Sequence, residues 1–405
     1  MHPTKTAHVV IGAQFGDEGK GRLTDYRAAQ TGGDALVVRF NGGAQAGHTV
    51  VAPDGRRHVF SHIGSGTLAG AATYLSRFFV ANPILFLKEV DTLATLDARP
   101  VVYADPASPV TTPYDMMINQ IVERERGDGR HGSCGIGFGE TLERNLDGRF
   151  ALTVADLADP SALTRRLDAI RREYAPARLA RLGFAHTFGP NADLFRSDAI
   201  LARYVEDAER FLDATITAEA RTAIGNRPLV FEGAQGLLLD QDRGCFPHVT
   251  RSNTGLRNVL TLANEWGLER LDVTYATRAY LTRHGAGPLP RELPEKPYPG
   301  IVDETNRPNA YQGALRFAWL DLDLLGRAVR EDLSDAAAHP ALTVNAGLAI
   351  TCLDQLGGAA ARYYREGRPR QTSLETFAAA AAEAVGVKQV LLSFGPGGES
   401  TLHGL

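Results

Sequence analysis

A short stretch near the N-terminus combines glycines, two acids and a lysine, which are residue types that handle phosphate and metal ions. It reads HVVIGAQFGDEGKGRLTDY and runs from His8 to Tyr26. The β-branched run at its start predicts a buried strand, and the residues after Gly21 predict the start of a helix. A glycine-rich turn between strand and helix offers free backbone N–H groups and the positive end of a helix dipole. The stretch therefore predicts a phosphate-binding turn.

This turn differs from the standard P-loop, in which GxxxxGK is followed by Ser or Thr. Only the acids Asp17 and Glu18 stand between its glycines, and Gly21 follows Lys20 where a P-loop has a hydroxyl. Because that hydroxyl normally binds Mg²⁺, another hard oxygen must do so here, and Asp17 is the nearest. A capped surface turn with solvated charges is the alternative interpretation of this stretch alone.

Two further glycine-rich turns follow predicted buried strands. In VVRFNGGAQAGHTVV, His48 lies between two small neighbours, Gly47 and Thr49. A lone histidine is more often structural, but beside a phosphate-binding turn a cationic imidazole can stabilise a transferring phosphoryl group. In LVFEGAQGLLLDQDRGCFPHVTRSNTG, Gln235 could contact the edge of a base and Thr250 could bind a phosphate.

Composition limits the class of protein. The 405 residues carry a net charge of -4, which gives no basic surface for nucleic acid or an anionic membrane. Cys134, Cys245 and Cys352 lack the spacing of a disulfide framework or a zinc site. The N-terminus has no signal-peptide pattern, and no apolar run reaches about 18 residues. We therefore expect a cytoplasmic protein with no nucleic-acid or membrane partner.

Strand-like apolar runs alternate with helical patterns along the chain. The runs are ALVVRF, PVVYAD, RPLVFEGAQG, LDVTYATRAYL, ALTVNAGLAITCLD and QVLLSFGPG. This alternation predicts an α/β fold with a large, mainly parallel central sheet flanked by helices. Residues 156–219 have Ala, Arg, Leu and Asp at helical spacing, which predicts a helical insertion within a single domain over 1–405. Residues 285–313 are too many for an ordinary connector and predict a functional loop.

Together these segments resemble one family, the adenylosuccinate synthetases. The resemblance rests on GDEGKG, GGAQAGHT, FEGAQG, PHVTRSNT, RHGAGPLPRE, WLD, CLD and FGPG, in the family's order over nearly the whole chain. It implies a P-loop-NTPase-like fold and a homodimeric, cytoplasmic ligase of purine biosynthesis. Such an enzyme uses GTP and Mg²⁺ to phosphorylate O6 of IMP, and the amino group of L-aspartate then displaces that phosphate.

The resemblance implies roles for individual residues. Asp17 corresponds to the base that removes the N1 proton and also binds Mg²⁺, together with the carbonyl of Gly47. His48 corresponds to the acid that supports phosphoryl transfer, and Lys20 and Gln235 complete the catalytic set. The residues implied for binding the nucleoside triphosphate are Gly16, Asp17, Glu18, Gly19, Lys20, Gly21, Gly47, His48, Thr49, Asp354, Gly395, Pro396 and Gly397.

The resemblance also implies where the other substrates bind. The residues implied for the acceptor nucleotide are Asn41, Ser133, Arg144, Gln235 and Thr250. Among them, Arg144 is the candidate for an arm that crosses the dimer interface to the 5′-phosphate of the acceptor. Gln312 and Arg316 are implied for L-aspartate, and Asp354 is the acid that would bind the guanine of the donor.

Departures from the family pattern leave the substrates open. HGSCGIGFG, with Ser133, replaces the usual GTTGRGIGP, and NAYQGALRFAWLD, with Arg316, replaces an arginine-rich aspartate loop. Cys352 replaces the lysine that covers the guanine. These changes are similar to the phage 2-aminoadenylosuccinate synthetases, which use dGMP and adenine nucleotides, whereas the retained Asp17 favours IMP. We therefore expect IMP with GTP. The alternatives are dGMP with ATP or dATP, and a catalytically inactive nucleotide-binding regulator.

Overall fold

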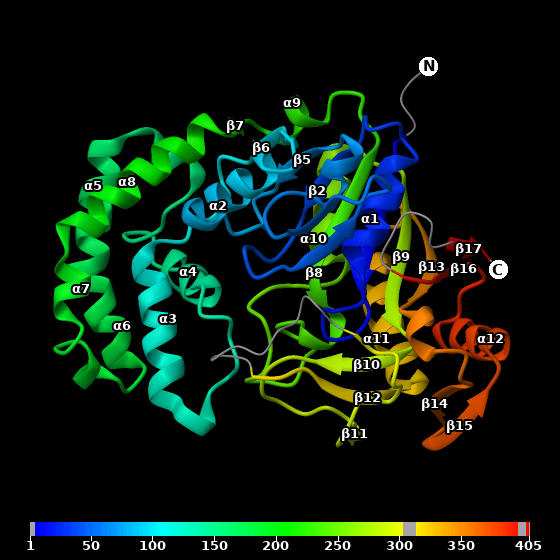
Figure 1. Ribbon diagram of the computed structural model, residues 1–405. Helices are drawn as coiled ribbons and strands as arrows, with labels where there is room; N and C mark the ends of the chain where they lie inside the picture. Colours follow the sequence, from blue (N-terminus) through cyan, green and yellow to red (C-terminus); the bar gives the residue numbers. More distant parts are fainter. Residues whose placement is uncertain (1–4, 303–312, 396–401, 405) are drawn as a thin grey trace.

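The computed structural model describes residues 5–302, 313–395 and 402–404. Its main feature is a ten-stranded sheet in the order β17-β16-β13-β9-β1-β8-β2-β5-β6-β7 (Figure 1). Neighbouring strands run parallel except β16 and β17, which are antiparallel. The strands are β1 (Thr6–Gly12), β2 (Leu36–Arg39), β5 (Ala72–Leu75), β6 (Val102–Ala104), β7 (Ile216–Thr217), β8 (Leu229–Gly236), β9 (Arg270–Arg278), β13 (Thr343–Thr351), β16 (Val390–Ser393) and β17 (Leu402–Gly404). The predicted α/β fold with a large, mainly parallel sheet is confirmed.

Helices cover both faces of this sheet, as continuous apolar strands require. Alternate residues of β1 point to opposite faces. Val9 and Ile11 belong to the main hydrophobic core, whereas Val10 packs with Leu23 of α1 on the other face. Helices that pack in these cores include α1 (Lys20–Ala29), α9 (Ala220–Ile224), α10 (Leu256–Trp266), α11 (Leu322–Ser334) and α12 (Leu374–Val385).

A second hydrophobic core lies among the helices at the left of Figure 1. These helices are α2 (Pro83–Ala94), α3 (Pro113–Arg126), α4 (Phe138–Asn145), α5 (Pro160–Ala169), α6 (Ala175–Arg181), α7 (Ala192–Arg196) and α8 (Asp198–Asp213). The predicted insertion at 156–219 contains α5 to α8 and the short strand β7. Its inclusion in a single domain stays a prediction. Within the described ranges, no helix is long and apolar enough to cross a membrane.

A second sheet was not foreseen from the sequence. The run LDVTYATRAYL, predicted as one strand, divides at Ala279, where β9 ends in the main sheet and β10 begins in another. Both halves are buried, so the apolar run gives no sign of the break. The second sheet contains β10 (Tyr280–Arg283), β11 (Glu292–Leu293), β12 (Arg316–Asp321), β14 (Ala361–Arg365) and β15 (Arg368–Thr372). A separate hairpin joins β3 (His48–Val51) and β4 (Arg57–Phe60).

Candidate functional site

The glycine-rich turn between β1 and α1 is organised around the buried carboxylate of Glu18. The backbone N–H groups of Gln14 and Gly16 donate to its Oε1 at 2.9 and 2.8 Å, and Lys20 Nζ donates to its Oε2 at 2.8 Å. Lys20 Nζ also donates to the carbonyl of Gly16 at 2.6 Å. The turn is therefore held by its own charged residues, and a bound phosphate would share Lys20 with Glu18.

The start of α1 explains why glycine follows Lys20. Gly19 takes the N-cap position with φ 81° and provides no side-chain cap for the first N–H groups of the helix. A Cβ on Gly21 would lie 2.8 Å from His48 Cβ and 3.0 Å from Ser65 Oγ. The hydroxyl residue of a P-loop does not fit at this position. The close approach places His48 directly beside the phosphate-binding end of the helix.

His48 is paired with a buried acid from a distant part of the chain. Its Nδ1 lies 2.7 Å from Glu232 Oε1, and the Glu232 carboxylate also accepts from Arg39 at 3.3 Å and from the backbone N–H of Ser65 at 3.0 Å. Burial lowers the pKa of the His48 imidazole, and the Glu232 carboxylate opposes that shift. Burial also opposes ionisation of Glu232, but the charges of Arg39 and His48 outweigh it and lower its pKa to about 2. The pairing leaves Nε2 of His48 as the nitrogen that can meet a ligand.

Asp17 lies in the same turn, and its backbone and its carboxylate differ in their contacts. Its backbone carbonyl accepts a hydrogen bond from Arg278 Nε, but in the described part of the chain no hydrogen bond reaches the carboxylate. Burial raises the pKa of the Asp17 carboxyl, and the charges of Arg278 and His284 oppose the increase. A desolvated carboxylate without a donor is suited to accept a proton or bind a cation.

Gln235 touches the turn from the end of β8. A Cβ on Gly16 would lie 3.2 Å from Gln235 Cα, so the two glycine-rich segments are in direct contact. Gln235 has φ 62°, a conformation that costs energy in a residue with a side chain. Its buried Oε1 has no hydrogen-bond partner within the described ranges. The strained backbone and the unsatisfied oxygen both indicate a ligand-binding residue.

Two other residues predicted for the acceptor nucleotide hold the local backbone. The fully buried Asn41 donates to the carbonyl of Ala234 at 3.0 Å and accepts from its N–H at 2.8 Å, which fixes the end of β8 beside Gln235. Thr250 is 8% exposed, and its backbone N–H donates to the carbonyl of Leu239 at 2.8 Å. Asn41 thus fixes the end of β8 and lies next to the glycine-rich turns.

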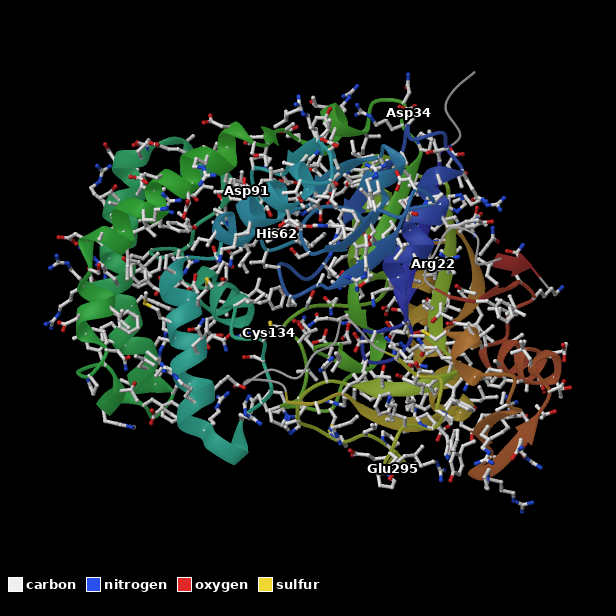
Figure 2. The ribbon with its side chains drawn as sticks, viewed as in Figure 1. Arg22, Asp34, His62, Asp91, Cys134 and Glu295 are labelled. Carbon is white, nitrogen blue, oxygen red and sulfur yellow. The ribbon has the colours of Figure 1, made fainter. Side chains whose placement is uncertain are left out.

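The residues predicted for the donor base lie beyond the other side of the turn. Thr351 Oγ1 donates to the carbonyl of Glu18 at 2.9 Å, which joins the end of β13 to the turn. Asp354 is exposed and accepts from the N–H of Gly395 at 2.7 Å. Arg22, on α1 (Figure 2), donates from Nε to Ser393 Oγ at 3.1 Å. Three residues predicted for binding lie outside the described ranges: Gln312, Pro396 and Gly397.

A loop after α3 carries Ser133 and is organised by Glu123. The Glu123 carboxylate accepts from the backbone N–H groups of Gly132 at 2.8 Å and Ser133 at 3.2 Å, and Ser133 Oγ accepts from Asn119 at 2.7 Å. A Cβ on Gly132 would lie 2.8 Å from the N atom of Ala286. The loop with Ser133 is therefore packed against the loop that follows β10.

Arg316 lies on the far side of that same loop. Its guanidinium forms a two-point ion pair with Glu292, with one distance of 2.8 Å, and donates to the carbonyls of Gly285 at 3.1 Å and Gly287 at 2.8 Å. An incoming aspartate carboxylate would compete with Glu292 for Arg316. Its role in aspartate binding stays a prediction.

Arg144 is not placed as expected. It is fully buried, pairs with Asp115 at 2.9 Å, and donates to the carbonyls of Phe150 at 2.6 Å and Val110 at 2.7 Å. These contacts use the guanidinium inside the helical core, so Arg144 would have to leave Asp115 to bind an acceptor phosphate, and its role there stays a prediction. The loose spacing around GETLER made the sequence position unreliable. The expected homodimer stays a prediction as well.

The geometry places the glycine-rich turns at the carboxyl ends of neighbouring parallel strands, where α/β proteins bind ligands. A sequence model described as adenylosuccinate synthetase matches residues 9–357. The adenylosuccinate synthetase of Neisseria gonorrhoeae is 33% identical over 361 residues, covering 86% of this chain and 77% of that protein. The chain belongs to the adenylosuccinate synthetase family.

Other comparisons agree with this assignment. The adenylosuccinate synthetase of Xylella fastidiosa is 36% identical over 359 residues, with 86% of this chain and 77% of that protein covered. The fold matches the fully ligated adenylosuccinate synthetase of Plasmodium falciparum with a TM-score of 0.70 at 17% identity, over 96% of this chain and 98% of that one. It also matches the succinoaminodeoxyadenylate synthetase of cyanophage S-2L, bound to dGMP and dATP, with a TM-score of 0.58 at 16% identity, over 97% and 94%. At these identities the structural matches establish the adenylosuccinate synthetase fold.

Sequence reasoning missed several residues of this adenylosuccinate synthetase site. Glu232 lies within the FEGAQG motif and could have been found there as a buried acid facing a histidine. His284 lies within RHGAGPLPRE, and its charge acts on Asp17. Its buried Nδ1 has no hydrogen-bond partner in the part of the chain described. Glu123 belongs to a helix with no distinguishing pattern, so no sequence signal could have indicated its role.

Proposed function

We propose that this chain catalyses the GTP-dependent condensation of L-aspartate with the 6-oxo group of IMP, giving adenylosuccinate, GDP and phosphate. The observation that carries the proposal is the contact of the Asp17 turn with the His48–Glu232 pair and with Gln235. A base, a phosphoryl-stabilising imidazole and an unsatisfied amide then meet at one edge of the sheet. Membership of the adenylosuccinate synthetase family supports the same reaction.

The first step activates the acceptor. Asp17 removes the proton from N1 of the purine, and the electron pair moves through C6 to O6. O6 attacks the γ-phosphorus of GTP, and the bond from that phosphorus to the β–γ bridging oxygen breaks, which releases GDP. His48 donates from Nε2 to the transferring group, and Glu232 stabilises the charged imidazole. The N–H groups at the start of α1 contact the phosphates.

The second step forms the new C–N bond. The amino nitrogen of L-aspartate attacks C6 of the 6-phosphoryl intermediate, the C6–O6 bond breaks, and the phosphate leaves with its electron pair. The amine loses a proton and the purine ring is restored. Arg316 releases Glu292 and binds a carboxylate of the aspartate. A planar guanidinium can donate two parallel hydrogen bonds to a carboxylate.

A Mg²⁺ ion fits the donor set of this site. Among the described residues, the Asp17 carboxylate accepts no hydrogen bond, and no cluster of three or more His, Cys, Asp or Glu side chains could hold a metal. Mg²⁺ commonly takes one carboxylate and completes its shell with phosphate oxygens and water. We propose Asp17 and the carbonyl of Gly47 as its protein ligands. When bound, the ion neutralises negative charge on the phosphates.

The dGMP alternative has one observation in its favour. The Ser133 loop is bound by Glu123 and Asn119, and Gly285 packs against it. The contact of this loop with an acceptor nucleotide can therefore differ from the contact in family members that use IMP. Against it, a 2-amino group next to N1 would crowd Asp17. We therefore keep IMP as the proposed acceptor and treat dGMP as the competing outcome.

The decisive experiment measures phosphate release and product mass with IMP, GMP and dGMP, each with GTP or ATP, with and without L-aspartate. We expect the highest kcat/KM with IMP and GTP and no complete turnover without aspartate. A clear preference for dGMP would assign the chain to 2-aminoadenylosuccinate synthesis. Phosphoryl transfer that ignores aspartate would indicate a kinase, and no product in a single-turnover experiment would indicate a regulator.

A further inference from the structure

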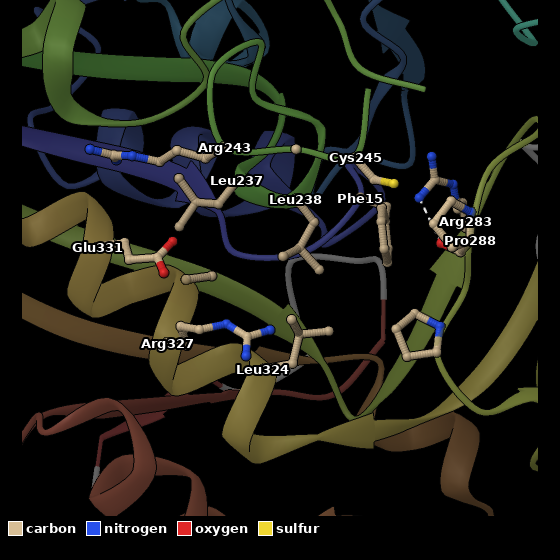
Figure 3. Close-up of a pocket in the computed structure, with 13 residues that line it drawn as sticks. Phe15, Leu237, Leu238, Arg243, Cys245, Arg283, Pro288, Leu324, Arg327 and Glu331 are labelled. Atoms are coloured by element: carbon tan, nitrogen blue, oxygen red, sulfur yellow. Dashed lines mark hydrogen bonds between the residues drawn. The ribbon is translucent and has the colours of Figure 1, made fainter. Parts of the chain in front are cut away.

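A small cavity lies next to the glycine-rich turn and outside the proposed reaction site. Its volume is about 180 Å³, and it opens between β10, α11 and the residues after β8 (Figure 3). Phe15, Leu237, Leu238 and Leu324 form much of its apolar wall. Four charged side chains interrupt this wall and determine what the cavity can bind. They are Arg243, Arg283, Arg327 and Glu331.

Within the described residues, Arg283 is a buried cation without an anionic partner. It is 2% exposed, and its guanidinium carbon lies 4.5 Å from the ring centre of Phe15. It donates to the carbonyls of Pro288 at 2.8 Å and His248 at 3.1 Å, but its buried Nε has no partner within the described residues. Burial, and then the charge of Arg316, lower its pKa to about 10.

This arrangement is unfavourable for the empty protein. Buried charges are normally paired because an isolated charge loses its hydration without compensation. The two carbonyls use only two of the five N–H donors of an arginine. Arg283 is therefore already desolvated and oriented, and an anion reaching it from the cavity would gain an ion pair at little further cost.

Arg327 supplies a second cation from α11. It is exposed, and the described residues provide it with no hydrogen bond or ion pair. Other arginines nearby are engaged: Arg243 pairs with Asp335 at 2.6 Å, and Arg330 donates to the carbonyl of Ala384 at 2.8 Å. The absence of a partner is therefore particular to the arginine of α11 that lines the cavity.

The size and charges of the cavity restrict its ligand. At about 180 Å³ the cavity is smaller than typical small-molecule pockets of about 300–1,000 Å³, so it suits a short ligand better than a nucleotide. An inorganic phosphate could meet one arginine but would leave the apolar wall uncovered. In a short chain with a carboxylate at each end, one carboxylate can pair with Arg283 and the other with Arg327, while the chain between them covers the apolar wall. We propose that this cavity binds a short dicarboxylate of about the size of succinate.

The dicarboxylate could be a free metabolite or L-aspartate, and Glu331 distinguishes these sources. The side chain of Glu331 lines the cavity one turn after Arg327 and has no partner among the described residues. An ammonium group on the ligand would pair with it. L-aspartate should therefore bind more tightly than succinate if an amino acid is the natural ligand, and Glu331→Gln should remove that difference. Equal binding of the two would identify a free dicarboxylate.

The test is calorimetric titration of the full chain, without nucleotides, with succinate and with L-aspartate. We expect saturable binding that weakens at least about tenfold in Arg327→Gln, because a charged pair is lost, and also in Ala328→Leu, which fills the cavity. Arg330→Gln removes the same charge from the same helix on the side facing α12 and should bind as the unmodified chain does. Thermal unfolding of each variant without ligand checks that it is folded.

Arg316→Gln separates this site from the proposed reaction site. Binding that survives Arg316→Gln but is lost in Arg327→Gln supports the cavity. Absence of saturable binding, or equal binding in the unmodified chain and in folded Arg327→Gln, overturns the proposal. Because no step of the measurement uses turnover, a failure of the proposed reaction would appear separately, as an absence of aspartate-dependent product.

Discussion

Replacing Glu232 by Gln tests the buried pair that orients His48. The substitution keeps the size of the side chain but removes its charge. In the unmodified chain, Glu232 accepts from His48 at 2.7 Å, from Arg39 at 3.3 Å and from the backbone N–H of Ser65 at 3.0 Å. A neutral amide cannot stabilise a cationic imidazole to the same extent. Its NH₂ group would also lie against the N–H donors that the carboxylate accepts from, and would find no acceptor there.

The expected loss of rate follows from these contacts. A hydrogen bond involving a charged group contributes about 1.5–3 kcal/mol. If the contact of His48 with Glu232 is fully used only when the imidazole is charged in the transition state, its loss lowers kcat by about tenfold to about 150-fold. KM should change less, because Glu232 itself does not contact the substrates in the proposed mechanism.

The same substitution should change how stability depends on pH. The pKa of Glu232 is lowered from its ordinary value of 4.5 to about 2, which corresponds to about 3 kcal/mol of folding stability. Because the folded-state pKa is the lower one, this stability is present above about pH 4.5 and is lost as the pH falls toward about 2. Glu232→Gln should therefore be less stable at neutral pH and show a flatter acid limb.

The assay is steady-state phosphate release at saturating substrates across the neutral pH range, together with thermal unfolding. Glu89→Gln is a matched control, because Glu89 is another buried acid. It accepts from the backbone N–H of Ser61 at 2.8 Å and lies 3.5 Å from His62, which Figure 2 labels. It should lower stability and leave kcat nearly unchanged. Unchanged kcat in Glu232→Gln, or an equal loss in Glu89→Gln, would refute the assigned role.

Three further substitutions test the remaining parts of the site. Asp17→Asn removes the base and should lower kcat at least about a hundredfold with little change in thermal unfolding; near-normal turnover would assign the base elsewhere. Gly21→Ala places a Cβ 2.8 Å from His48 Cβ and should displace the imidazole, which a drop in kcat at saturating substrates would detect and an unchanged kcat would exclude. Arg316→Lys should raise the KM for aspartate, whereas Glu292→Gln, which frees Arg316, should lower it; an unchanged KM in both would move aspartate binding away from Arg316.

Much of the architecture was predictable because it depends on local patterns. Apolar runs alternating with helical spacing indicate parallel strands and their helices, and these runs became β1, β2, β6, β8, β9, β13 and β16. Glycine-rich turns after buried strands indicate ligand-binding edges, because such turns leave N–H groups free. The division of LDVTYATRAYL at Ala279 was not predictable, since a strand that leaves one sheet for another stays buried throughout.

The sequence by itself determined the family, the α/β class and the position of the phosphate-binding turn, because each depends on residue types at fixed short spacing. Only the tertiary structure decided which charges meet. His48 and Glu232 are 184 residues apart, and they meet because the strand order places β8 between β1 and β2. Arg144 forms a buried ion pair with Asp115 in the helical core. Arg283 and Arg316 lie opposite each other across β10 and β12. The register of the two strands sets this pairing, and the spacing of residues along the chain does not reveal that register.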